Sequence, residues 1–288
     1  MDIGDRGMST SPAAMLARYG LAASKQRGQN FLCDDNVTRK VVAAASVGPG
    51  DIVVEVGSGF GALTLGLADA ARHVIAVEID AGVARAFRGE YPIDERITLV
   101  EKDILSFDFG AAAREWSVGR VVVVGNIPYS VTSPLITRLI DSREAVARAV
   151  LMVQSEVGAR IVACPGGDDY SALSAVTRYH ARVNRLFTVR ASCFYPRPKV
   201  DSGVIEINFE EPPGRASDPD LFAAVVRAAF GKRRKMLRQS LSTLLKEAGL
   251  SAPELEQRSG IAMTRRGETL SVEEFDAIAT ELGESHGG

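Results

Sequence analysis

Between residues 51 and 209, short runs of apolar and β-branched residues alternate with stretches whose apolar residues recur at helical spacing. Strands that are buried on both faces have this continuous apolar character, so the pattern predicts a mostly parallel sheet built from strand-helix-strand units. Helices over 62–69 and 81–88 fit between the first three strands. The predicted strands are 52–56, 73–78, 97–101, 120–125, 149–154 and 204–209.

The pattern changes at 210–217, a polar segment rich in Pro and Gly that is typical of a linker. Beyond it, start and stop signals such as the N-cap at Asp218 predict helices over 219–230, 232–248 and 271–282. The fold class is therefore α/β, with a small all-helical domain at the C-terminal end. We expect a flexible tail over 1–24, an α/β domain over 25–209, a linker over 210–217 and a helical domain over 218–284.

Composition narrows the class of protein. The 288 residues, 46% of them hydrophobic, are enough to bury the cores of one large domain and one small one. No apolar run approaches the roughly 20 residues of a membrane-spanning helix, and the polar character of 1–24 argues against a secretory signal. Three cysteines and three histidines lack metal-ligand spacing, so we expect no metal, no disulfide and no membrane partner, and a monomer in the cytoplasm.

A glycine loop follows the first predicted strand, with Gly57 and Gly59 at alternate positions before a helix. Glycine lets the backbone turn sharply and approach a ligand closely, so a nucleotide-like ligand fits there. Glu78 ends the second strand, where a carboxylate can accept both ribose hydroxyls of an adenosine. A dinucleotide dehydrogenase would carry a related loop and acidic residue, so these features alone leave the cofactor open.

Two further features favour S-adenosylmethionine over a dinucleotide. The loop lacks the G-x-G-x-x-G spacing, and Glu55 precedes it, near the place expected for a cationic methionine group. A third carboxylate, Asp103, follows the third strand, where it suits a hydrogen bond to the adenine amine of the cofactor. Carboxylates at the ends of three successive parallel strands line the crevice in which such sheets bind ligands.

The most specific motif is 126–129, Asn-Ile-Pro-Tyr, directly after the fourth strand. An exocyclic amine is a poor nucleophile, and acceptors near its N–H groups stabilise the positive charge that grows on nitrogen as it attacks a methyl group. Asn126 can supply a side-chain carbonyl and 127–128 a main-chain carbonyl, while Pro128 keeps the loop rigid. Tyr129 offers a stacking face for a base. The motif predicts an amino-methyltransferase.

Several separated motifs together resemble the ribosomal RNA adenine N6,N6-dimethyltransferase family, and the resemblance spans roughly 26–282. The motifs are 29–32 (QNFL), 126–129 (NIPY), 194–202 (FYPRPKVDS) and 230–235 (FGKRRK). The resemblance implies a Rossmann-like class I methyltransferase domain that uses S-adenosylmethionine. Its implied substrate is a pair of adjacent adenines in the loop near the 3′ end of small-subunit ribosomal RNA, each dimethylated late in ribosome assembly in an immature particle.

The resemblance also implies roles for individual residues. Base handling falls to Asn126, Tyr129 and Phe194, with Pro128 completing the catalytic loop. Because Phe194 lies among prolines, we expect it to be exposed in a loop. The cofactor contacts expected from the family pattern and the glycine loop are Asn30, Leu32, Gly57, Gly59, Glu78, Asp103 and Asn126.

Two departures from the family pattern leave the substrate open. Ile127 stands where Leu is more usual, and Ser130 where Asn is frequent. Isoleucine is common at that position in the related macrolide-resistance methylases, which modify large-subunit RNA. A non-catalytic ribosome-assembly factor on the same fold is a further alternative, although an intact Asn-x-Pro-Tyr motif favours catalysis.

A basic cluster marks the start of the predicted helix over 232–248. Positive side chains in the first turn of a helix oppose its macrodipole, so such a cluster favours an anionic partner, and phosphate of RNA is the obvious one. Arg197, Lys199, Arg265 and Arg266 can extend this surface. The predicted RNA-binding residues are Lys232, Arg233, Arg234, Lys235 and Arg238.

Overall fold

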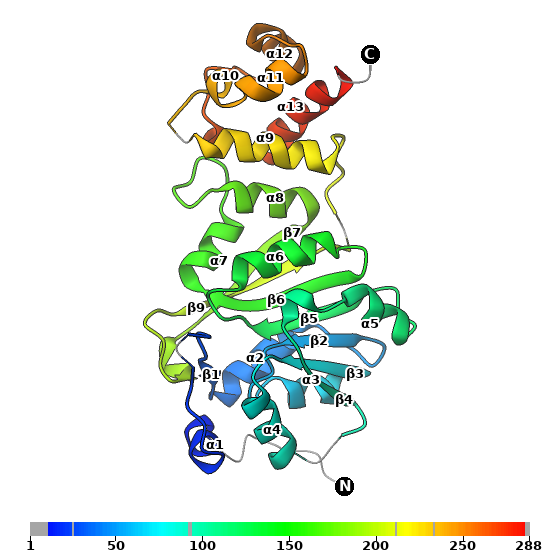
Figure 1. The fold of residues 1–288 in the computed structure, drawn as a ribbon, viewed down its shortest axis with the longest axis vertical. Coiled ribbons are helices and arrows are strands. Elements are labelled where there is room, and N and C mark those ends of the chain that lie inside the picture. Colours follow the sequence, from blue (N-terminus) through cyan, green and yellow to red (C-terminus); the bar gives the residue numbers. More distant parts are fainter. Residues whose placement is uncertain (1–10, 25, 92–93, 211, 233, 286–288) are drawn as a thin grey trace. The chain divides into compact units, whose positions relative to one another are not determined.

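The computed structural model describes residues 11–24, 26–91, 94–210, 212–232 and 234–285 (Figure 1). Its contacts divide the chain into two compact units, of which the first comprises 1–158 and 184–210 and the second 159–183 and 211–288. The predicted α/β domain over 25–209 therefore includes a stretch, 159–183, whose contacts belong to the helical unit. Aromatic packing explains this, because Tyr179 stacks on Phe222 with ring centroids 3.9 Å apart.

The first unit contains a sheet of seven strands in the order β4-β3-β2-β5-β6-β9-β7 (Figure 1). The strands from β2 to β6 are parallel to their neighbours, and β9 is antiparallel to β6. The predicted α/β class is confirmed, and β7 was missed because half of its residues are exposed and polar. The strands are β2 (Ile52–Val56), β3 (His73–Glu78), β4 (Ile97–Glu101), β5 (Val121–Asn126), β6 (Val146–Gln154), β7 (Arg182–Val189) and β9 (Ser202–Asn208).

Helices connect the strands and cover the sheet. Alternate side chains of the strands, such as Val53 and Val122, pack with Val41 of α2 and Leu67 of α3 in one core cluster. This alternation is the two-residue period of a strand, in which successive side chains point to opposite faces of the sheet. The connecting helices are α2 (Asp35–Ala45), α3 (Thr64–Ala70), α4 (Ala81–Glu90), α5 (Phe109–Glu115) and α6 (Thr132–Asp141), with the 3-10 turns η1 (Ile104–Ser106) and η2 (Ala191–Cys193).

The expected flexible tail over 1–24 is wrong for its second half; residues 1–10 lie outside the described residues. Ser11 caps α1 (Pro12–Arg18) by accepting the Ala14 N–H at 3.3 Å. Met15 is fully buried in a cluster with Phe60 and other apolar side chains. Because these partners come from distant segments, the local polarity of the tail gave no sign of them.

The second unit is helical around one apolar core. The continuous helix predicted over 232–248 is wrong: of the described residues, 232 and 234–236 are not helical, and the helical part is divided between α10 and α11. The Leu237 N–H donates to the Arg265 carbonyl at 2.8 Å, so a distant segment satisfies a donor that a longer helix would have used. The helices are α7 (Ser155–Val162), whose first four residues belong to the first unit, α8 (Ala172–His180), α9 (Pro219–Gly231), α10 (Leu237–Ser240), α11 (Ser242–Glu247), α12 (Ala252–Ser259) and α13 (Val272–Glu284), with the 3-10 turn η3 (Gly267–Thr269).

The segment predicted as a linker, 210–217, is anchored near its end; residue 211 lies outside the described residues. Asp276 of α13 accepts the main-chain N–H groups of Ala216 and Ser217, each at 3.0 Å. Across the described part of the chain, no helix is both long and apolar enough to cross a membrane.

Candidate active site

A cavity of about 250 Å3 lies at the carboxyl ends of the parallel strands in the first unit. This is the edge at which open α/β sheets bind their ligands. Every residue predicted to hold the cofactor or the base lines this one cavity, although their individual roles remain predictions. These residues are Asn30, Leu32, Gly57, Gly59, Glu78, Asp103, Asn126, Pro128, Tyr129 and Phe194.

The glycine loop forms one wall of the cavity. Gly57 and Gly59 have φ values of +68° and +56°, a backbone region that side chains other than glycine rarely adopt. At Gly59 a Cβ would also lie only 3.2 Å from the Phe31 ring. Phe31 itself packs on Phe60, with ring centroids 4.5 Å apart. Glycine is therefore required both by the turn and by the segment that packs over it.

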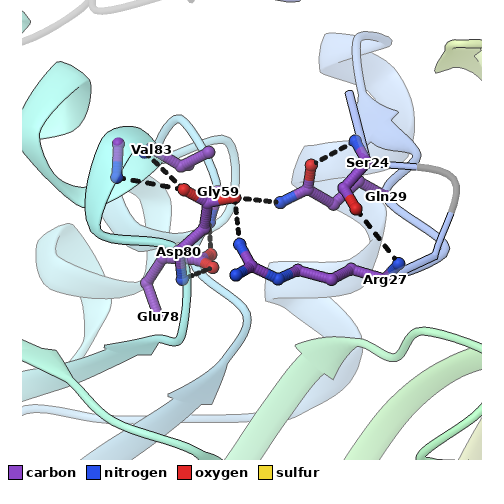
Figure 2. A network of polar contacts seen from close by, with 8 residues as sticks. Ser24, Arg27, Gln29, Gly59, Glu78, Asp80 and Val83 are labelled. Carbon is purple, nitrogen blue, oxygen red and sulfur yellow. Dashed lines mark hydrogen bonds and ion pairs between the residues drawn. The ribbon is translucent and has the colours of Figure 1, made fainter. Parts of the chain in front are cut away.

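Glu78 is fixed at the end of β3 by main-chain donors (Figure 2). Its side chain accepts the Gly59 N–H at 3.0 Å and the Asp80 N–H at 2.9 Å. Burial raises the pKa of this carboxyl, and these hydrogen bonds oppose the rise because they favour the charged form. Each carboxylate oxygen keeps a second lone pair for a ligand hydroxyl.

Glu55 lies deeper, within β2, and is 1% exposed. Its carboxyl accepts a hydrogen bond from the Thr64 hydroxyl. Burial raises its pKa to about 8; the Thr64 hydrogen bond lowers the value and the nearby charge of Glu78 raises it further. Without a cation in the cavity, this carboxyl therefore holds its proton at neutral pH.

A pH dependence of stability follows from Glu55. Since its folded pKa, about 8, lies above the unfolded value, its contribution is complete below about pH 4.5 and is lost as pH rises toward 8. The Glu55→Gln variant has no proton to lose at this position. As pH rises, the unfolding free energy of the native chain should therefore fall relative to that of the variant, by at most ~1.4 kcal/mol per pH unit. Urea unfolding of both proteins between pH 5 and 8 measures this, with the exposed Glu101→Gln as control. Parallel curves for Glu55→Gln and the native chain would contradict it.

Asn126 ends β5 at the centre of the cavity wall. Its side-chain Nδ2 donates to the main-chain carbonyl of Asn30 at 2.8 Å. This contact uses only the NH2 group, so Oδ1 can accept a hydrogen bond from a ligand. The next residues are also held, since the Ile127 N–H donates to the Met152 carbonyl at 2.9 Å. The Pro128 carbonyl accepts the Val131 N–H at 3.1 Å and so closes the turn.

Gly125 lets β5 approach β2 closely enough to place Asn126. A Cβ at Gly125 would lie 2.6 Å from the Val56 carbonyl oxygen, which is main chain and cannot rotate away. Gly125→Ala should therefore lower the unfolding free energy by about 1–3 kcal/mol, as overpacking of a core does. Urea unfolding measures the loss, and Gly119→Ala is the matched control because its Cβ would meet nothing within 4 Å. Equal stability of the two variants would contradict the argument.

Two distant motifs meet in a small sheet that the sequence did not predict. β1 (Phe31–Leu32) pairs antiparallel with β8 (Phe194–Tyr195), so that Leu32 lies opposite Phe194. The expected exposure of Phe194 is wrong, because its side chain is only 4% exposed. It packs in the sheet core and also lines the cavity, since the strand pairing turns it inward.

Asp103 and Tyr129 complete the predicted set. Asp103 is exposed after β4, and its Oδ1 accepts the Leu105 N–H at 2.9 Å, which caps the 3-10 turn. Tyr129 is half-buried; burial raises the pKa of its hydroxyl, and a hydrogen bond with Gln154 opposes the rise. Tyr129 is thus partly accessible beside Asn126, as a stacking residue requires.

The predicted basic cluster belongs to the second unit, and only Arg238 of its described members lies in the first turn of a helix. Lys232, Arg234 and Lys235 are exposed between α9 and α10, and Arg238 is exposed within α10. Arg233 lies outside the described residues. Lys232, Arg234 and Lys235 follow the C-terminal end of α9, where positive charge suits the macrodipole, so the predicted conflict with a helix dipole is wrong for these three residues.

The four residues that were expected to extend the basic surface lie in different units, two in each. Arg197 and Lys199 are exposed in the first unit. In the second unit, Arg265 forms an ion pair with Glu274, and Arg266 lies 3.8 Å from Glu268. RNA binding by the predicted residues remains a prediction.

Several polar residues that support the site were not predicted from the sequence. Asp80 caps α4 and also contacts Arg27 and Gln29, 53 and 51 positions away in the chain. Its spacing two residues after Glu78, before a helix, was the available N-cap signal. Thr64 was likewise missed, because nothing in its local pattern predicts a contact with Glu55. No group of three or more His, Cys, Asp or Glu among the described residues could hold a metal ion.

The parallel sheet, the glycine loop and the carboxylate at the end of β3 define a Rossmann-like class I methyltransferase domain, here joined to a helical unit. The family model described as "Ribosomal RNA adenine dimethylase" matches residues 20–283. The chain belongs to the ribosomal RNA adenine dimethylase family, as its motifs predicted.

Relatives match almost end to end. A protein of Moorella thermoacetica named "Ribosomal RNA small subunit methyltransferase A" is 44% identical over 276 residues, which are 93% of this chain and 96% of the relative. A protein of Desulforapulum autotrophicum with the same name is 40% identical and covers 96% of this chain and 98% of its own length.

Two solved structures share the fold. A dimethyladenosine transferase from Plasmodium falciparum matches with a TM-score of 0.74 at 23% identity, over 89% of this chain and 98% of that one. The 23S rRNA methyltransferase ErmE matches with a TM-score of 0.67, also at 23% identity, over 88% of this chain and all of that one. At this identity the likeness concerns the fold, which agrees with the predicted class.

Proposed function

We propose that this chain transfers methyl groups from S-adenosylmethionine to the N6 amines of two adjacent adenines near the 3′ end of small-subunit ribosomal RNA, and dimethylates each. The observation that carries the proposal is the fixed amide of Asn126. Its Nδ2 is held by the Asn30 carbonyl at 2.8 Å, in the cavity that also contains Glu78. Family membership and the names of the relatives support the same activity.

The cavity residues fit this cofactor. Glu78 would hold the ribose hydroxyls, Asp103 the adenine amine, and the loop from Gly57 the main part of the molecule. The Ser58 hydroxyl supports a polar ligand here, since it is buried and has no hydrogen-bond partner among the described residues although it lines the cavity. The protonated Glu55 can lose its proton to match a cationic methionine group.

When bound, S-adenosylmethionine supplies a methyl group on a positively charged sulfur. The Asn126 Oδ1 would accept one N–H of the adenine amine, and the Ile127 carbonyl would accept the other, because the Pro128 carbonyl already accepts the Val131 N–H at 3.1 Å and the Thr132 hydroxyl at 3.4 Å. These acceptors stabilise the positive charge that grows on nitrogen. The methyl donor would leave as S-adenosylhomocysteine, and the alkylated nitrogen would lose its proton to water. Tyr129 and Phe194 would hold the base.

The partner in this proposal is an immature small ribosomal subunit. This chain would bind it late in assembly, as a monomer in the cytoplasm. The exposed residues between α9 and α10, with Arg238, would contact phosphates of the RNA. No metal takes part in the proposed reaction, because the methyl donor is already activated.

The test is methyl transfer from labelled S-adenosylmethionine to immature small subunits and, separately, to large-subunit RNA, followed by nucleoside analysis. N6,N6-dimethyladenosine on small subunits alone is the expected result. Label on large-subunit RNA alone would instead assign the chain to the resistance methylases. An absence of label on both would leave a binding factor on a methyltransferase fold.

A further inference from the structure

Residues 26–32 line the cavity beside the glycine loop, and Arg27 and Gln29 of this segment contact Asp80 (Figure 2). Figure 2 shows Arg27 and Gln29 reaching from this segment toward Asp80. Ser24, which precedes the segment, donates its N–H to the Gln29 side chain at 2.8 Å, and the Gln29 N–H donates to the Ser24 carbonyl at 3.1 Å. Gln29 is therefore held on both sides.

Asp80 divides its two oxygens between two tasks. Oδ1 caps α4 by accepting the N–H groups of Gly82 at 3.0 Å and Val83 at 3.3 Å. Oδ2 pairs with the guanidinium of Arg27 and accepts from Gln29 Nε2 at 3.1 Å. Burial raises the pKa of Asp80, but the hydrogen bonds from Val83 and Gln29 and the charge of Arg27 outweigh burial and hold it below its ordinary value. A capping aspartate needs only one oxygen, so the cap of α4 does not require the contacts that Oδ2 makes with Arg27 and Gln29.

The other end of the segment reaches the reacting group. Asn30 donates its side-chain Nδ2 to the Gly28 carbonyl at 3.0 Å, which shapes the turn. Its main-chain carbonyl accepts Asn126 Nδ2 at 2.8 Å. The direction of the Asn126 amide is thus set by a main-chain atom one residue away from Gln29, which Asp80 holds.

We propose that Asp80 is a positioning residue for methyl transfer. It fixes segment 26–32, and the Asn30 carbonyl of this segment then orients the Asn126 amide toward the base. Asp80 also donates its main-chain N–H to Glu78, so one residue links the strand end that holds the cofactor to the loop that holds the adenine. It does this without lining the cavity. The proposal rests on the proposed function for its reaction, but its structural part does not.

Asp80→Asn isolates the second task. In this variant the asparagine Oδ1 can still cap α4. Its NH2 group replaces the Oδ2 acceptor, so it can no longer accept from the Arg27 guanidinium or from Gln29 Nε2. Loss of orientation should lower the single-turnover rate about tenfold or more at saturating S-adenosylmethionine and RNA, because small misplacements of a reacting group are costly. Asp108→Asn is the matched control: Asp108 caps α5 through the Ala111 N–H and lies 4.0 Å from Arg114, in the same unit.

A second variant tests rescue. Asp80→Asn combined with Gln29→Glu exchanges donor and acceptor, so the contact can form again while Glu accepts the Ser24 N–H and pairs with Arg27. The rate should return to within about threefold of the native rate if the contact itself matters, as a double-mutant cycle would show. In parallel, hydrogen exchange of the Arg27 and Gln29 amides should be faster in Asp80→Asn than in the native chain and in Asp108→Asn.

The outcomes separate the two proposals. A rate loss in Asp80→Asn that the added substitution Gln29→Glu reverses supports the positioning role. A native rate in Asp80→Asn, or an equal loss in Asp108→Asn, would overturn it. If the native chain methylates no RNA, the proposed function fails by itself; native exchange rates for Arg27 and Gln29 in Asp80→Asn would then overturn the positioning role, and faster exchange would support its structural part.

Discussion

Replacing Asn126 by alanine should slow methyl transfer by roughly 100-fold to 1,000-fold, the usual loss when one group that stabilises developing charge is removed. The reason is that Oδ1 of Asn126 would no longer accept an N–H of the attacking amine. Binding of S-adenosylmethionine should be largely kept, since Glu78 and the glycine loop are untouched. Single-turnover rates and calorimetric binding of S-adenosylmethionine measure the two effects separately.

The control for this substitution is Asn184→Ala. Asn184 lies in β7 of the same unit and donates to Glu206 at 3.2 Å, and neither residue lines the cavity. Asn126→Asp adds a second comparison, because it keeps an acceptor oxygen but cannot donate to the Asn30 carbonyl. Equal losses of binding and turnover in Asn126→Ala would show that the residue acts only through the structure of the cavity.

Glu78→Ala should have the opposite profile and weaken S-adenosylmethionine binding by about 10-fold to 100-fold, as expected when a charged hydrogen-bond acceptor is lost. The physical reason is that no other described carboxylate accepts the Gly59 N–H, so the ribose acceptor and the anchor of the loop are lost together. Calorimetric titration with S-adenosylmethionine gives the affinity, and the rate at saturating cofactor gives the chemical step.

Glu78→Gln is the graded control for that prediction. It keeps one acceptor oxygen for the Gly59 or the Asp80 N–H, so its affinity should fall between those of the native chain and Glu78→Ala. An unchanged affinity in Glu78→Ala, together with a lost chemical step, would reverse the roles assigned to Glu78 and Asn126.

Much of the site could be predicted because it depends on strand ends. Parallel strands bring their carboxyl ends to one edge, so Gly57, Glu78 and Asn126 had to converge once the strands were identified. The supporting contacts could not be predicted in this way. Asn126 meets Asn30 across 96 positions of sequence, and Arg27 meets Asp80 across 53. Local spacing contains no information about which distant loop packs over a strand end.

The sequence by itself determined the mostly parallel α/β class, the family and ten of the residues that line the cavity, because apolar periodicity and short motifs are local properties of the chain. Only the tertiary structure decided the rest. It paired 31–32 with 194–195, buried Phe194 and Met15, and placed 159–183 with the helical unit. It also ended α9 before the basic residues. Each of these depends on contacts between distant segments, whose energies outweigh the local preferences for a loop, a tail or a continuous helix.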